Sequence, residues 1–210
     1  MRETMTNAGV ALAVAGCAVV AGVIGWNIGR PHHQSSAPPA AATTLRQAAT
    51  TMESITSYAF SGRVTIGIES LTLTGQFSAP DHLHETLSLP GVAPVERILV
   101  GTSTWQRSGT KWQRVAAAST SSDPRTTFGA LAGVTNVTAN AGVYSFSVTG
   151  PATAALISGT GATTTITGTA TVQGGRIVNV SYRSPAGAGT AVTFSYSGLN
   201  TTPPVTAPAA

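Results

Sequence analysis

Residues 71–77 read Leu-Thr-Leu-Thr-Gly-Gln-Phe, and apolar and polar side chains alternate along this segment. Successive side chains of a β-strand point to opposite faces, so Leu71, Leu73 and Phe77 share one face, while the two threonines and the glutamine share the other. One apolar and one polar face are typical of an antiparallel sheet that is covered on one side only. The stretch therefore predicts a β-domain.

The same period of two recurs on both sides of this stretch, with turn residues roughly every 8–14 residues. Such spacing is typical of a meandering antiparallel sheet, and we expect roughly eight to ten strands. The apolar members of further strands are Tyr58, Phe60, Val64 and Ile66; Leu83, Leu87 and Leu89; Tyr144, Phe146 and Val148; Ile166, Ala170 and Val172; Val178, Val180 and Tyr182; and Val192, Phe194 and Tyr196. Residues 95–100 are expected to form another strand, and residues 104–114 a hairpin.

Two helices are expected beside this sheet. Apolar residues at three- and four-residue spacing from Leu45 to Ile55 predict a leading helix that is capped by Thr43 or Thr44 and ends near Ser57. Asp123 and Pro124 predict the start of a short middle helix. A wide twisted sheet tends to curl, and two helices cover only part of it, so an apolar hollow is expected as a ligand site. The predicted fold class is α+β, a curled antiparallel sheet packed on two helices.

The N-terminal part carries no charged side chain from Thr4 to Gly29. Residues 8–29 are long enough for a transmembrane helix, which would leave 1–7 in the cytoplasm. Val14-Ala15-Gly16-Cys17 offers the alternative of a lipoprotein signal, with Cys17 as the lipidated residue, although apolar residues follow the cysteine. A cleaved secretory peptide fits less well, because its apolar core is shorter. We expect a Pro/Ala/Ser linker at 30–43, the β-domain at 44–199 and a disordered tail at 200–210.

Composition narrows the classes of partner. Charged residues make up 9% of the chain, against a usual value of about 25%, and the net charge is +4. Five of the eleven basic residues lie between Arg97 and Arg125, but no basic-aromatic repeat accompanies them, so we expect a solvated face and no nucleic-acid partner. A single cysteine allows no intramolecular disulfide.

No arrangement of side chains in the sequence predicts catalysis. His82 and His84 lie two residues apart, as a metal pair would, but no third ligand is identifiable, so no metal and no cofactor are expected. There is no G-x-S-x-G motif, and the carboxylates are scattered, so we expect the protein not to be an enzyme. Trp105 and Trp112, seven residues apart across a hairpin, suit either cross-strand packing or the rim of an apolar pocket.

A family resemblance is carried by several short motifs between residues 44 and 199. They are Ser57-Tyr58-Ala59-Phe60-Ser61-Gly62, residues 71–77, Ala79-Pro80-Asp81, residues 100–105 (Val-Gly-Thr-Ser-Thr-Trp) and residues 109–112 (Gly-Thr-Lys-Trp). In this order they resemble actinobacterial envelope lipoproteins of the LppX/LprG type and the related LolA-like carriers. The resemblance implies a half-barrel sheet wrapped over helices, with a cavity for acyl chains. It also implies that the protein moves or presents lipids, lipoproteins or lipoglycans outside the cytoplasmic membrane.

The sequence therefore predicts a monomeric, membrane-anchored envelope protein whose extracytoplasmic domain binds a lipid or an acylated lipoprotein or lipoglycan. The expected cavity residues are Phe60, Leu73, Phe77, Leu87, Trp105, Phe146 and Phe194. An alternative is a sensor or protein-interaction module with the same fold and no transport role. An enzyme would need a pocket in which the histidines or carboxylates converge.

Overall fold

The computed structural model describes residues 40–107, 109–116, 125–150, 153, 156, 164–184 and 189–209. The expected cytoplasmic segment 1–7, the expected anchor 8–29 and Cys17 lie outside these residues. Among the residues described, no helix is both long and apolar enough to cross a membrane.

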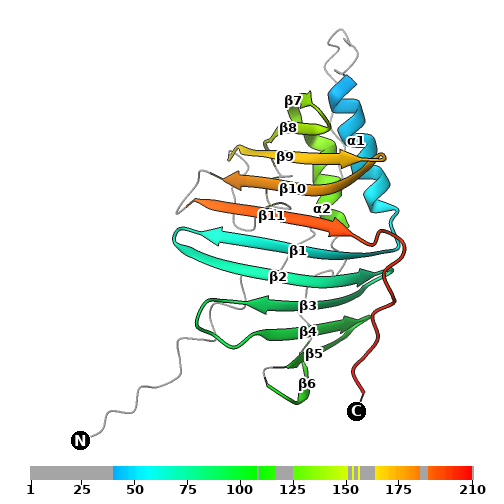
Figure 1. Cartoon of the computed structure of the whole chain (residues 1–210), viewed down its shortest axis with the longest axis vertical. Helices are drawn as coiled ribbons and strands as arrows, with labels where there is room; N and C mark the ends of the chain where they lie inside the picture. Colours follow the sequence, from blue (N-terminus) through cyan, green and yellow to red (C-terminus); the bar gives the residue numbers. More distant parts are fainter. Residues whose placement is uncertain are drawn as a thin grey trace, which may run out of the picture.

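The described residues form one antiparallel sheet of 11 strands in the order β6-β5-β4-β3-β2-β1-β11-β10-β9-β8-β7 (Figure 1). All neighbouring strands in the sheet are consecutive in sequence except β1 and β11. The pairing of β1 with β11 brings the two ends of the domain together. The strands are β1 (Ser57–Ile66), β2 (Glu69–Ser78), β3 (His82–Ser88), β4 (Val95–Val100), β5 (Ser103–Arg107), β6 (Trp112–Val115), β7 (Thr135–Asn140), β8 (Val143–Val148), β9 (Ile166–Gln173), β10 (Arg176–Ser184) and β11 (Thr190–Ser197). The predicted meander is confirmed, with more strands than expected.

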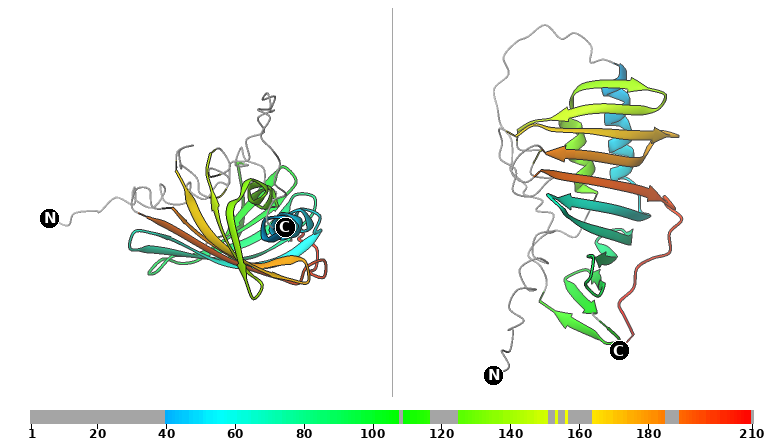
Figure 2. Two further views of the ribbon diagram at one scale, coloured as in Figure 1. Left: turned by 90° about the horizontal axis from the view of Figure 1, so that it is seen from above. Right: turned by 60° about the vertical axis from the view of Figure 1, so that its left-hand side comes forward.

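The sheet is curled, and the helices lie within its concave side (Figure 2). We call this concave side the inner face and the opposite side the outer face. Side chains directly opposite each other in an antiparallel pair point to the same face. Phe77, opposite both Tyr58 and Leu83, belongs to the core and so assigns all three residues to the inner face. The registers of the other strand pairs then assign the paired residues of each strand to one face, apart from the irregularities at Val178 and at residues 136–137.

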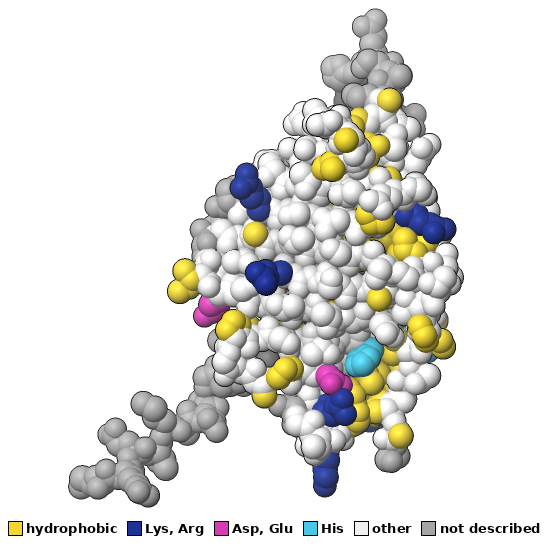
Figure 3. Space-filling model, in the orientation of Figure 1, with side chains coloured by type: hydrophobic (Ala, Val, Ile, Leu, Met, Phe, Trp, Pro, Cys, Tyr) yellow, Lys and Arg dark blue, Asp and Glu magenta, His cyan; other side chains and the backbone are white. Residues whose placement is uncertain are grey.

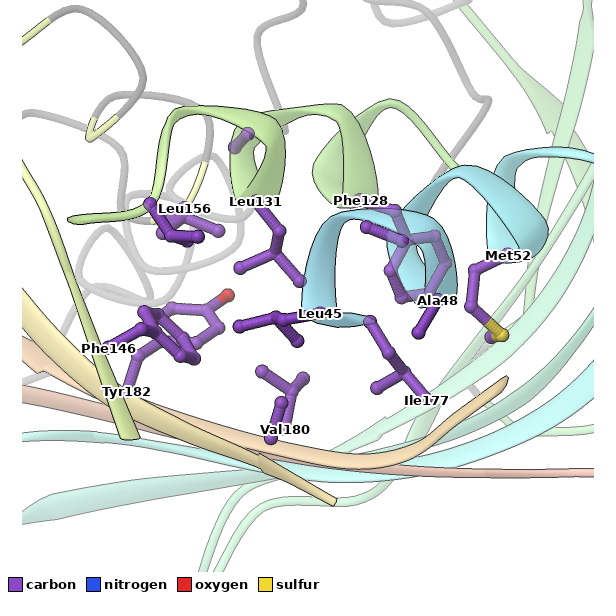
Figure 4. Packing of buried hydrophobic residues seen from close by; sticks show 14 of the residues in the cluster. Leu45, Ala48, Met52, Phe128, Leu131, Phe146, Leu156, Ile177, Val180 and Tyr182 are labelled. Carbon is purple, nitrogen blue, oxygen red and sulfur yellow. The ribbon is translucent and has the colours of Figure 1, made fainter. Parts of the chain in front are cut away.

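Two helical segments cover part of the inner face. Helix α1 (Ala40–Glu53) turns Leu45, Ala48 and Met52 inward, each at most 1% exposed, and packs against β7, β9 and β10. The middle helix is a single turn, α2 (Thr126–Gly129), that continues as the 3-10 turn η2 (Ala130–Gly133). Side chains from both helices meet those of β8 and β10 in the core shown in Figure 4. The predicted curled sheet and its leading helix are confirmed.

The boundaries of the leading helix differ from the expectation. Helix α1 begins at Ala40, inside the predicted linker 30–43, because alanines and threonines 40–44 continue the helical stripe with Ala42 buried. It ends at Glu53 rather than near Ser57, because Ser57 is already paired with Ser78 as the first residue of β1.

The C-terminal segment also differs from the expectation of a disordered tail at 200–210. The side-chain carbonyl of Asn200 accepts hydrogen bonds from the Thr56 backbone N–H at 2.7 Å and from its hydroxyl at 3.1 Å. The Val205 N–H donates to the Ser78 hydroxyl at 2.9 Å, and the Val205 side chain is buried. Residues 200–209 therefore run along the strand ends of the sheet, as the red trace of Figure 1 shows, held by polar bonds that composition alone does not reveal.

Candidate functional site

An apolar strip runs along β1 on the inner face. Inward-facing side chains alternate from Tyr58 through Phe60 and Val64 to Ile66, and their exposure rises from 1% at Tyr58 to 55% at Ile66. The strip thus leads from the buried core to the open end of the sheet, where β1 turns into β2 (Figure 1).

Neighbouring strands widen this strip into a surface. Leu71 lies opposite Val64, and Leu73 lies between Gly62 and Leu87. On the other side of β1, Val192 and Phe194 lie opposite Val64 and Gly62. We call this surface the apolar track, and its members are Phe60, Val64, Ile66, Leu71, Leu73, Leu87, Val192 and Phe194. Helix α1 packs on β7, β9 and β10 instead, so most of these side chains keep partly exposed surface.

Glycines let the aromatic rings of the track lie close to the backbone. A Cβ placed on Gly62 would lie 2.3 Å from the ring of Phe194, its direct cross-strand partner. A Cβ on Gly75 would lie 2.3 Å from the His84 carbonyl oxygen and 2.6 Å from the ring of its partner Phe60. Each ring therefore occupies the space that a side chain would fill. The track is consequently a shallow floor of flat-lying rings and aliphatic side chains.

Aromatic residues close the inner end of the track. The ring centroid of Tyr58 lies 5.2 Å from that of Phe77 and 5.6 Å from that of Tyr196. Phe128 of α2 reaches Tyr196 at 5.2 Å, which joins this cluster to the helices. Burial raises the pKa of the Tyr196 hydroxyl well above its usual value, with Tyr58 and Tyr182 adding to the shift, so this end of the track is uncharged.

A polar row continues from the track across the inner face. Along one line, Phe60 pairs with Gly75, Gly75 with Glu85, and Glu85 with Arg97, after which Gln106 and Gln113 follow on β5 and β6. Glu85 forms an ion pair with Arg97, although its side chain is only 7% exposed. Burying a charge in this way requires a partner of opposite sign. The inner face therefore combines the apolar track over β11, β1, β2 and β3 with one polar row that crosses β3–β6, flanked on β3 by the apolar Leu83 and Leu87.

The outer face is chemically different. Its strand residues are mostly threonine and serine, and Figure 3 shows this face largely white, with isolated arginines. A hollow of about 440 Å³ lies at its β2–β6 side, between the sheet and the C-terminal segment. Its walls are Gln76, His84, Ile98, Trp112 and residues 204–209.

Comparison with known proteins gives a structural match only. No protein-family model matches the chain, and no curated protein is significantly similar to it in sequence. The solved structure of the lipoprotein LppX from Mycobacterium tuberculosis superposes with a TM-score of 0.59 at 16% identity, over 81% of this chain and 100% of that one. LprF from Mycobacterium bovis superposes with a TM-score of 0.60 at 13% identity, over 84% of this chain and 100% of that one.

The fold is that of the mycobacterial lipoprotein LppX and of LprF. The predicted resemblance to the LppX/LprG type is confirmed at the level of fold.

Within this LppX-like fold the predicted cavity residues fall into three groups: residues of the apolar track, residues of the closed core, and Trp105 on the outer face. Phe60, Leu73, Leu87 and Phe194 lie together on the apolar track. Phe77 and Phe146 face inward but are 0% and 3% exposed, so they belong to the closed core. Of these residues, Phe60, Leu87 and Phe194 keep surface that a ligand could reach, whereas Leu73 is 7% exposed.

The prediction for Trp105 is wrong about the face. Trp105 lies opposite Ile98 and Arg114 on the outer face, whereas its neighbour Thr104, 4% exposed, pairs with the inward-facing Leu99. Trp105 was expected to line the apolar cavity, but the turn at 101–102 sets the register so that Thr104 faces inward instead. Trp112 lies on the same outer face, and the Cζ atom of Arg107 lies 4.7 Å from the centroid of its ring.

The two histidines of the domain do not converge. The Nδ1 atom of His82 lies 3.0 Å from the Val205 carbonyl, and His84 lies 3.7 Å from Glu96. In the part of the chain that the structure describes, no three histidine, cysteine or acidic side chains are grouped as metal ligands.

Sequence reasoning missed Val64, Ile66 and Leu71 as site residues, although their alternation was visible in the pattern. It also missed the Glu85–Arg97 pair, whose members are twelve residues apart and meet only through the β3–β4 register.

Proposed function

We propose that this protein binds an amphipathic, acyl-bearing molecule (a lipid, or an acylated lipoprotein or lipoglycan) and carries or presents it in the cell envelope. The observation that supports this most is the apolar track, which leads from the sealed aromatic cluster at Tyr58 to the exposed end of β1 at Ile66. An acyl chain bound along the track would contact side chains from β11, β1, β2 and β3.

The driving force would be removal of apolar surface from water. Each buried methylene contributes about 0.8 kcal/mol, so several methylenes are needed to offset the cost of immobilising the ligand. No reacting group is required for such binding. We accordingly propose a carrier rather than an enzyme, and the lipoprotein LppX shares the fold.

The polar row gives the ligand a direction. Arg97 and Glu85 neutralise each other, and Gln106 and Gln113 add amide groups on the same face. Paired charges and amides suit hydrogen-bonding head groups better than a bare acyl chain. We therefore propose that the acyl part lies over β1 and β2, with the polar part over β3–β6.

The proposed setting is the outer side of the cell membrane, with a monomeric domain held there by residues 8–29 or by a lipid on Cys17. The run from Thr4 to Gly29 without a charged residue supports membrane attachment in either form. Intact-mass analysis of the native membrane form distinguishes the two, because lipidation would start the chain at Cys17.

The test is lipid analysis of the full chain purified from its native membrane, together with uptake of a fluorescent fatty acid. Leu71→Asp places a charge on the track, and Thr72→Asp places the same charge one residue away on the exposed outer face. We expect lipid in the wild-type extract, uptake by wild type and T72D, and loss of uptake in L71D. An extract without lipid, combined with no uptake by wild type, would overturn the proposal.

A second candidate is a sensor or interaction module that moves no lipid. It is favoured by the full burial of Phe77 and Phe146, which shows that side chains of the protein itself fill part of the concave side. The hollow beside Trp112 and the C-terminal segment would then be a place for a partner. Wild type that takes up no acyl probe, but is retained with an envelope protein whose binding Trp112→Ala abolishes, would favour this second function.

A further inference from the structure

One end of the sheet carries three exposed apolar side chains. Ile68 is fully exposed at 102%, Ile66 is 55% exposed and Val92 is 47% exposed. They lie in the β1–β2 turn and the β3–β4 connection, which are side by side in both Figures 1 and 2. We call Ile66, Ile68 and Val92 the apolar tip.

Folding does not require an isoleucine at this turn. Residues 67 and 68 form a two-residue hairpin loop between Ile66 and Glu69, and Gly67 has a positive φ of 60°. A glycine at the first loop position satisfies the turn, and small polar residues usually take the second. A single exposed apolar residue needs no explanation, but three on two neighbouring turns form a small protruding cluster.

The tip is continuous with the apolar track. Ile66 is the next inward-facing residue of β1 after Val64, and exposure increases along the strand up to it. The other exposed large apolar residue described, Val143, lies where β8 leaves β7, at the opposite ends of the strands. The tip thus marks the open end of the track and not a general feature of the turns.

We propose that the apolar tip inserts into the interfacial region of a lipid bilayer, so that the apolar track opens directly onto the membrane. The inference rests on the proposed lipid-binding function for its purpose. A stable protein interface buries roughly 800 Å² per partner, which is more than three protruding side chains provide. A bilayer needs no complementary shape and accepts protruding apolar groups.

Two further features favour a membrane as the occupant. Arg63 and Arg183 are exposed on the outer face of β1 and β10, where cations attract anionic head groups, while Glu69 at the turn limits this attraction. Ten residues, 30–39, separate the expected anchor from α1, and they span at most about 35 Å. The domain is therefore held within reach of the same bilayer.

The test is a depth measurement on the full chain in vesicles of phosphatidylcholine and phosphatidylglycerol. A water-soluble, environment-sensitive maleimide is attached to Ala93→Cys beside Val92, or to Asn140→Cys at the opposite end; both positions are exposed. Wild type without an added cysteine reports any labelling of Cys17, the only native cysteine. Lipids with a nitroxide on the acyl chain then quench only those labels that enter the bilayer.

We expect quenching of the label at residue 93 and none at residue 140. Ile66→Ser and Ile68→Ser should each lower the ratio of inserted to free domain roughly ten-fold, because each removes a largely exposed apolar side chain from the bilayer contact. The control Val143→Ser should leave quenching unchanged. Thermal unfolding checks that all variants stay folded, as expected for surface substitutions.

Equal quenching at residues 93 and 140, or quenching that survives the double Ile→Ser change, would overturn the inference. Shielding of residue 93 without nitroxide quenching, together with crosslinked dimers, would assign the tip to a second copy instead and would also overturn it. Lipid found in the wild-type extract despite either result would leave the proposed binding function standing, so the two failures are distinguishable.

Discussion

Glycine-to-alanine substitution tests whether the aromatic rings depend on the glycines opposite them. Gly168 faces Phe146, and a Cβ there would lie 2.6 Å from the ring and 2.6 Å from the Ser181 carbonyl oxygen. Phe146 is 3% exposed and is enclosed by the core, so neither neighbour can move freely. Overpacking of this kind costs about 1–3 kcal/mol, whereas alanine gains about 0.4–1 kcal/mol by restricting the unfolded chain. The expected net loss is about 1–2 kcal/mol.

Gly62→Ala is the matched comparison. Its Cβ would lie even closer to a ring, 2.3 Å from that of Phe194, but Phe194 is half-buried and can lift away from the sheet. Its backbone contact, 2.9 Å to the Thr193 carbonyl oxygen, is longer than the 2.6 Å found at Gly168. We therefore expect G62A to lose less stability than G168A, despite the shorter distance. Urea unfolding of residues 40–210, followed by far-UV circular dichroism, measures both. A G168A variant as stable as G62A or wild type would refute the role given to the buried ring.

An ion pair, the C-terminal segment and two buried tyrosines can be tested in the same way. Arg97→Met leaves Glu85 buried without its partner and should lower the free energy of unfolding by about 3 kcal/mol. Arg107→Met breaks a partly exposed pair with Glu96 and should cost at most about 1 kcal/mol. Urea unfolding measures both variants, and a loss of stability in R107M as large as that in R97M would contradict this difference. Val205→Ser should cost about 1 kcal/mol and speed proteolysis of the C-terminal segment, while Ala207→Ser, at an exposed position, should do neither; equal cleavage rates would argue against an anchored segment. Burial raises the pKa values of Tyr182 and Tyr196, so the folded state holds protons that the unfolded state releases above pH 10.0. The free energy of unfolding should therefore fall as the pH rises beyond that value. Absorbance at about 295 nm should show that both hydroxyls ionise only on unfolding, and ionisation of all tyrosines before unfolding would contradict their burial.

The sheet could be predicted from sequence because its signal is local. Alternation such as Leu71-Thr72-Leu73 is imposed by a face that is apolar along the whole strand, and turn residues mark where each strand ends. The α1 stripe from Leu45 to Met52 is equally local and was predicted for the same reason. Its exact start was not, because alanine and threonine at 40–44 suit a linker as well as a helix.

The candidate site could be predicted only in part, because it depends on registers. The pattern identified Phe60, Leu73, Leu87 and Phe194 as apolar, and the structure places them together. It could not show that Phe146 would be sealed by the core or that Trp105 would face outward, since both depend on how neighbouring strands and helices meet. The contacts of the Ser78 hydroxyl and the His82 Nδ1 atom with the backbone of Val205 join residues more than a hundred positions apart, and the sequence carries no local signal for them.

Photo-crosslinking maps where an acyl chain binds on the sheet. A fatty acid with a photoreactive group on its chain is bound to the folded domain and irradiated, and the crosslinked residues are identified by mass spectrometry. We predict crosslinks to Phe60, Val64, Leu71, Leu73, Leu87 and Phe194 on the inner face, and their loss in L71D but not in T72D. Crosslinks confined to the outer hollow around Trp112 and residues 204–209, or none at all, would contradict the account.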